Sequence, residues 1–79
     1  MDRAAISQHL EEARHHVAEG KKHIASQRAL IVQLERDGLD TDLAERLLVQ
    51  FEEVQAIYIA DRDRLEKISG RRLGAPAPL

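Results

Sequence analysis

The first half of the chain carries apolar residues at helical spacing. Ile6, Leu10, Val17, Ile24, Ile31 and Leu34 follow one another at steps of 4, 7, 7, 7 and 3, the period of an amphipathic helix and not the alternation of a strand. Read as heptads, one seam position is held by Leu10, Val17, Ile24 and Ile31 and the other by Ile6, Ala13, Gly20, Gln27 and Leu34. We therefore predict a helix over residues 3–36.

A turn over residues 37–41 should end this helix. Gly38 suits the left-handed position just beyond a helix C-terminus, because it has no Cβ to clash. With Gly38 at that position, Leu39 and Leu34 become the two residues whose apolar contact accompanies a Schellman motif. The spacing thus predicts a Schellman turn.

The residues after the turn offer oxygens that can cap the next helix. Asp40, Thr41 and Asp42 are all capping types, and Asp42 stands three residues before Glu45, the spacing of a capping box. We predict that the second helix begins at Asp42.

The second helix should cover residues 42–69, with Gly70 ending it. Residues 71–79 are rich in glycine, alanine and proline without periodicity, so we expect a disordered tail. Residues 1–70 then form one hairpin domain. The main apolar stripe of the second helix is Leu43, Leu47, Phe51, Val54, Ile57, Tyr58, Leu65 and Ile68.

So short a turn folds the two helices antiparallel. Pairing Arg36 with Thr41 makes the numbers of facing residues sum to about 77. This register places Gly20 beside Ile57 and Tyr58. A glycine inside a helix costs about 1 kcal/mol relative to alanine, so we predict that Gly20 is there to admit a large neighbouring side chain.

Both helices carry more apolar residues than one shared seam needs. Leu48, Ile59 and Val49 lie outside the main stripe of the second helix, and a stripe this wide indicates a second packing layer. We expect a homodimer in which two hairpins form a four-helix bundle. The expected core and interface residues are Leu10, Val17, Gly20, Ile24, Ile31, Leu47, Leu48, Phe51, Val54, Tyr58, Ile59 and Leu65.

The amino-acid composition argues against several classes of function. The 79 residues carry a net charge of −2 and only two aromatic residues, Phe51 and Tyr58, which argues against nucleic-acid binding through phosphates or stacked bases. No cysteine is present, so disulfides and thiolate metal sites are excluded. The longest uncharged run is far shorter than a membrane span, and we expect a cytoplasmic protein without a cofactor.

The histidines lie in the first helix, and one acidic residue interrupts the second stripe. His9, His16 and His23 are seven residues apart, about 10 Å between neighbours and too far to share a metal ion. They read as polar residues flanking the seam, or alternatively as a row of pH-sensitive groups. The same register places Asp61 near His16, and we hypothesise a polar pair that fixes the helix register.

No residue pattern indicates catalysis. Glu12 and His15 have the Glu-x-x-His spacing of di-iron bundles, but the second helix supplies no histidine. Phosphate-binding glycine motifs are absent. We therefore expect a non-catalytic, self-associating interaction module. The alternatives are a metal- or pH-responsive bundle that uses the histidines and glutamates of the first helix, and a monomeric adaptor that docks on a larger protein.

Three segments resemble a known group of proteins. HIASQR (23–28), LERDGLDT (34–41) and ADRDRL (60–65) are similar to the pattern of small bacterial helical-hairpin proteins of unknown function. The resemblance covers most of residues 9–65. It implies a helical hairpin and carries no activity, ligand or site residue.

Overall fold

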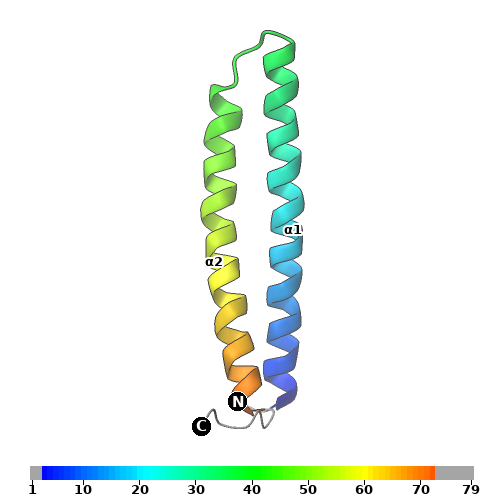
Figure 1. The fold of residues 1–79 in the computed structure, drawn as a ribbon, viewed down its shortest axis with the longest axis vertical. Helices are drawn as coiled ribbons and strands as arrows, with labels where there is room; N and C mark the ends of the chain where they lie inside the picture. The colour runs from blue at the N-terminus through cyan, green and yellow to red at the C-terminus, as the bar shows by residue number, and fades with distance from the viewer. Residues whose placement is uncertain (1–2, 73–79) are drawn as a thin grey trace.

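The protein is a pair of long helices joined by a short turn. The computed structural model describes residues 3–72, in which α1 (Arg3–Arg36) and α2 (Asp42–Arg72) lie side by side and run in opposite directions (Figure 1). The hairpin measures 57 × 26 × 14 Å along its principal axes. A helix with its side chains is about 10–12 Å across, so the molecule is one helix layer thick. The predicted all-α antiparallel hairpin is confirmed.

The seam of α1 lies where the heptads place it. All nine of its positions, from Ile6 to Leu34, are buried or half-buried against α2. The most deeply buried are Ile6, Ala13 and Val17. Leu10, Ala13 and Leu65 form a buried cluster far along both helices from the turn. The numbers of the residues that this cluster brings together across the helices sum to 75 and 78, close to the predicted register.

The face that α2 turns toward α1 differs from the predicted stripe. Leu43, Leu47, Val54 and Ile57 are 72%, 38%, 44% and 67% exposed, so the expectation that Leu47 and Val54 fill the core of this hairpin is wrong. A helix buries only the side that faces its neighbour, and the predicted stripe combined two sides of α2. The inner seam of α2, as we call the buried and half-buried positions facing α1, consists of Ala44, Leu48, Phe51, Gln55, Tyr58, Arg62, Leu65 and Ser69.

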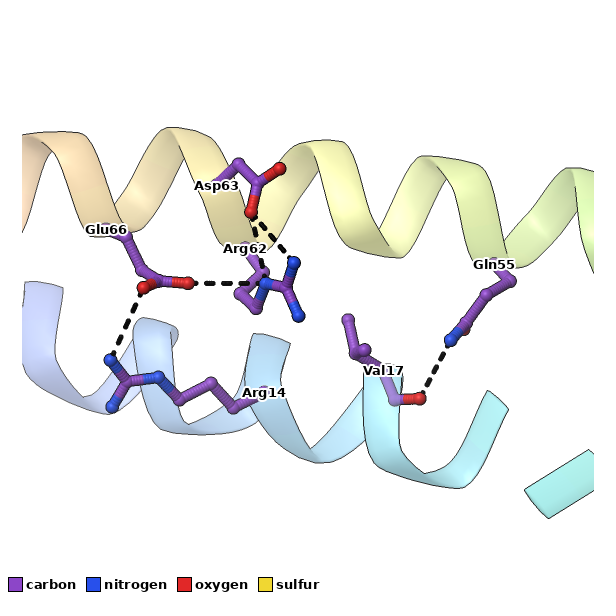
Figure 2. A network of polar contacts seen from close by, with 6 residues as sticks. All are labelled: Arg14, Val17, Gln55, Arg62, Asp63 and Glu66. Carbon is purple, nitrogen blue, oxygen red and sulfur yellow. Dashed lines mark hydrogen bonds and ion pairs between the residues drawn. The ribbon is translucent and has the colours of Figure 1, made fainter. Parts of the chain in front are cut away.

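Two glutamines in this interface hydrogen-bond to the opposite backbone. The Gln27 side chain donates to the Ala44 carbonyl at 2.8 Å, and the Gln55 side chain donates to the Val17 carbonyl at 2.9 Å (Figure 2). Both glutamines are buried, and a buried amide needs such partners. These bonds join the two helices at two levels along the long axis of the hairpin.

Gly20 packs against Gln55 and not against Ile57, which is exposed. A Cβ atom built on Gly20 would lie 2.6 Å from Cδ of Gln55 and closer still to its Oε1. The glycine therefore admits a close neighbour, as predicted, but the neighbour is a buried amide. Tyr58, the other predicted neighbour, lines the same groove as Gly20.

The turn is a Schellman motif followed by a capped helix. The Leu39 amide donates to the Leu34 carbonyl at 2.9 Å, the Gly38 amide donates to Glu35 at 3.1 Å, and Gly38 has φ +69°. These two bonds confirm the predicted Schellman motif at residues 34–39.

Thr41 provides the first helical carbonyl of α2, accepting from the Glu45 amide at 2.9 Å. The Asp40 carboxylate accepts from the Asp42 amide at 3.0 Å. Asp42 is thus the first residue inside the helix and pairs with Arg46 at 2.9 Å, so the predicted capping box from Asp42 to Glu45 is wrong.

Gly70 does not end α2, which continues to Arg72. A glycine inside a helix costs about 1 kcal/mol but keeps its amide donor, so helical hydrogen bonding can pass through it. Residues 71 and 72 of the predicted tail are therefore helical, and its residues 73–79 lie outside the described residues.

Candidate interaction surface

One long side of the hairpin is bridged by ion pairs. Arg14 lies 3.7 Å from Glu66, and Arg28 lies 3.0 Å from Glu52. Arg62 extends from the inner seam to this side and meets Glu66 at 3.3 Å (Figure 2). All of these pairs remain solvated, where each contributes at most about 1 kcal/mol. This ion-paired side is therefore polar and hydrated.

The opposite side holds a groove between histidine and aromatic rings. His16 lies about 200° around α1 from Arg14, two residues away at 100° each. Its ring stacks on Tyr58 with centroids 5.0 Å apart and planes 28° apart. His23 tilts against Phe51 at 6.1 Å and 59°. Two histidines of the predicted row thus cover aromatic rings of α2.

The groove has a volume of about 390 Å³ and a buried amide in its wall. Gln55 is 6% exposed, and its Oε1 makes no hydrogen bond and lies against Gly20. A glycine Cα hydrogen can make a weak C–H···O contact at such a position. The groove is lined by His16, Glu19, Gly20, His23, Phe51, Val54, Gln55 and Tyr58.

Beside the groove, α2 exposes a row of large apolar side chains. Leu43, Leu47, Val54 and Ile57 fall within an arc of about 80° on the helix, at 100° per residue. Leu30 of α1, 45% exposed, belongs to the same row of seven-residue steps as His16 and His23. Isolated exposed apolar residues are ordinary, whereas these four lie together on one side of α2 beside the groove.

His16 and Asp61 are neighbours that do not bond to each other. Both line a second groove of about 280 Å³. Asp61 hydrogen-bonds to Arg64, one turn along its own helix, while His16 stacks on Tyr58. The hypothesised direct pair is therefore wrong, and the buried hydrogen bonds that join the two helices come from Gln27 and Gln55 instead.

The remaining histidine contacts are local. His9 lies 4.0 Å from Glu12 and His15 lies 4.0 Å from Glu19, both within α1. In the described part of the chain, no group of three or more histidine, aspartate, glutamate or cysteine side chains is arranged to hold a metal ion.

The inner seam of α2 contains residues that sequence reasoning missed. Ala44, Gln55, Arg62 and Ser69 face α1 although none is a large apolar residue. A signal was present, because extending steps of 4 and 3 in both directions from Phe51 reaches all four positions. The predicted pattern followed hydrophobicity instead of this strict alternation.

Comparison with known proteins adds no relative. The chain matches no family model, no curated protein and no solved structure. The resemblance to small bacterial helical-hairpin proteins therefore stays a prediction. Within residues 3–72, neither helix has an apolar stretch long enough to cross a bilayer.

Proposed function

We propose that this chain is a non-catalytic interaction module that works by self-association. In this proposal two hairpins join through the groove side and form a four-helix bundle. The observation that carries it is the gathering of exposed Leu43, Leu47, Val54 and Ile57 on one side, while the other side is bridged by ion pairs. A helix layer with one apolar side and one charged side is typical of a layer that packs against one further layer through its apolar side.

The size of the hairpin also supports a second layer. Its broad face, 57 × 26 Å, is on the order of 1,500 Å², whereas a stable interface needs about 800 Å² from each partner. Among the described residues, the buried apolar cluster consists of Leu10, Ala13 and Leu65, and chains of this length usually need an additional source of stability. A second copy supplies it by covering apolar area that the single hairpin leaves exposed.

Two valines on α2 provide a matched test. Val54 is 44% exposed on the groove side, and Val49 is 52% exposed about 140° away around the helix. We expect light scattering after size exclusion to give about twice the chain mass of 8.9 kDa for the wild-type protein. Val54→Glu should give the monomer mass, because it places a charge in the apolar interface, and Val49→Glu should remain dimeric.

A monomeric wild-type protein at all concentrations would overturn the proposal. Equal loss of the dimer in both valine variants would also overturn it, because the groove side would then not be the interface. Circular dichroism of each variant separates loss of pairing from loss of helix. A cytoplasmic location belongs to the same proposal and rests on composition alone.

A further inference from the structure

The exposed apolar residues of α2 belong to a second heptad seam. Starting at Leu43, steps of 4 and 3 alternate along the whole helix, as they do in the inner seam. This alternation is the pattern that packs one helix along another. The outer seam, as we call it, consists of Leu43, Leu47, Gln50, Val54, Ile57, Asp61, Arg64 and Ile68.

The outer seam lies about 100° around α2 from the inner seam, since each of its positions precedes an inner position by one residue. The inner seam is occupied by α1, whereas the outer seam borders the two grooves at Val54, Asp61, Arg64 and Ile68 and is not covered by α1 along its length. Four of its five apolar members are 38% or more exposed. α2 is thus shaped to pack against two helices, of which the chain supplies one.

We propose that the outer seam pairs α2 with α2 of a second copy in antiparallel orientation, with the two-fold axis passing between Val54 and Ile57. This inference rests on the proposed self-association and specifies which helices meet and in which direction. In this register Val54 lies opposite the partner subunit's Ile57, and Leu43 lies opposite the partner subunit's Ile68.

The choice of α2 over α1 follows from the chemistry of the two helices on the groove side. There α1 presents His9, His16 and His23 together with Glu12 and Glu19. Direct pairing of two α1 helices would desolvate these groups against their own copies, which is costly without partners. Pairing through α2 buries leucine, valine and isoleucine and leaves the histidine row at the edge.

The antiparallel direction follows from charge. In a parallel pair every outer-seam residue meets its own copy, so Asp61 would face another Asp61 and Arg64 another Arg64. Like charges brought together in this way disfavour an interface. In the antiparallel register Asp61 lies opposite the partner subunit's Gln50, an amide that can donate to it, and each Arg64 keeps its contact with Asp61 of its own helix.

The register follows from the length of the outer seam. The seam runs from Leu43 to Ile68, and its midpoint falls between positions 55 and 56, which is where the proposed axis passes. Any shift by one heptad leaves one end of each seam unpaired and moves the Leu43–Ile68 contact apart. The proposed register therefore overlaps the two outer seams over their full length, with apolar pairs at the centre and at both ends.

Spin-label distances across the dimer test this arrangement directly. The chain has no cysteine, so Arg46→Cys, Glu53→Cys, Ala60→Cys and Lys67→Cys each carry one label site. All four positions are exposed and lie outside both seams. At about 1.5 Å rise per residue, the separations along the axis between equivalent labels are about 28, 8, 14 and 34 Å in that order.

The expected result is a distance that falls from residue 46 to residue 53 and rises again through 60 to 67. Helices in direct contact have axes about 8–10 Å apart, so the label pair at 53 should lie at about 20 Å. Four equal distances would show a parallel dimer and overturn this inference. Distances that fall and rise in the same order but never drop below about 30 Å would show pairing through α1, because two further interhelical spacings would then separate the labelled α2 helices. That result would overturn the inference as well.

The mass measurement distinguishes failure of the α2 pairing from failure of the proposed self-association. A dimer mass with the wrong distance series rejects the α2 pairing and leaves self-association intact. A monomer mass for the labelled and unlabelled protein rejects both.

Discussion

Gly20 and Gln55 form a contact whose energy can be measured by a double-mutant cycle. In an open helix, Gly→Ala stabilises by about 1 kcal/mol, because alanine loses less backbone freedom on folding. At Gly20 the new Cβ would lie 2.6 Å from Cδ of Gln55, well inside any normal contact. The Gln55 amide would then have to leave its place in the seam.

The cost follows from what that amide does. Its hydrogen bond to the Val17 carbonyl, 2.9 Å long and buried, contributes about 1 kcal/mol, and forcing extra volume into a filled site costs about 1–3 kcal/mol. Together these terms exceed the gain in helix propensity. We expect Gly20→Ala to destabilise the protein by about 1 kcal/mol, and a bulkier Gly20→Leu to destabilise it more.

The decisive comparison uses Gln55→Ala as the background. Without the amide, the new methyl group meets open space, so Gly20→Ala should stabilise by about 1 kcal/mol. The coupling energy is then about 2 kcal/mol, within the range for residues in contact. Urea denaturation followed by circular dichroism measures the stability of all four proteins. One fixed protein concentration is used, because the proposed self-association would add to stability. Stabilisation by about 1 kcal/mol in both backgrounds would refute this account of the glycine.

Three further substitutions test other parts of the hairpin by the same assay. Gly38→Ala should destabilise by about 1–2 kcal/mol, because Gly38 has φ +69° and alanine is strained there; Gly38→Asn should lose less, and equal losses would contradict the conformational argument. Leu65→Ala should destabilise by about 2–5 kcal/mol, since Leu65 belongs to the small buried cluster; a loss below 1 kcal/mol would show that the cluster adds little. Arg28→Ala should change stability by less than about 1 kcal/mol, because its pair with Glu52 is solvated, and a larger loss would show a stronger role for the ion-paired side.

Local signals in the sequence were sufficient to predict α1 and the turn. The heptads of α1 predict every buried position from Ile6 to Leu34, because α1 has one neighbour and one seam. Gly38 predicts the Schellman motif because the motif depends on local features alone: a residue without a Cβ at positive φ, and two backbone hydrogen bonds within residues 34–39. In both cases the information lies within a few residues of the feature it determines.

The buried side of α2 was harder to predict for a physical reason. α2 has two seams one residue apart, and the more apolar of them is the one that α1 leaves exposed. Hydrophobicity alone therefore favours Leu47 and Val54 over Ala44 and Gln55. The burial of Gln55 depends on a glycine 35 positions earlier that makes room for it. The periodicity of α2 alone cannot predict this contact with the other helix.

The hydrogen bonds from Gln27 and Gln55 to opposite backbone carbonyls have a consequence for alignment errors in folding. A coiled pair of helices can slide by one heptad and still match apolar residues. A slide of seven residues moves each amide about 10 Å along the opposite helix, where Gln55 no longer finds Gly20 and would meet a Cβ instead. Gly20 is the one glycine in the seam of α1, so the native alignment alone leaves room for the Gln55 amide. Hairpins misaligned by a heptad are therefore disfavoured during folding.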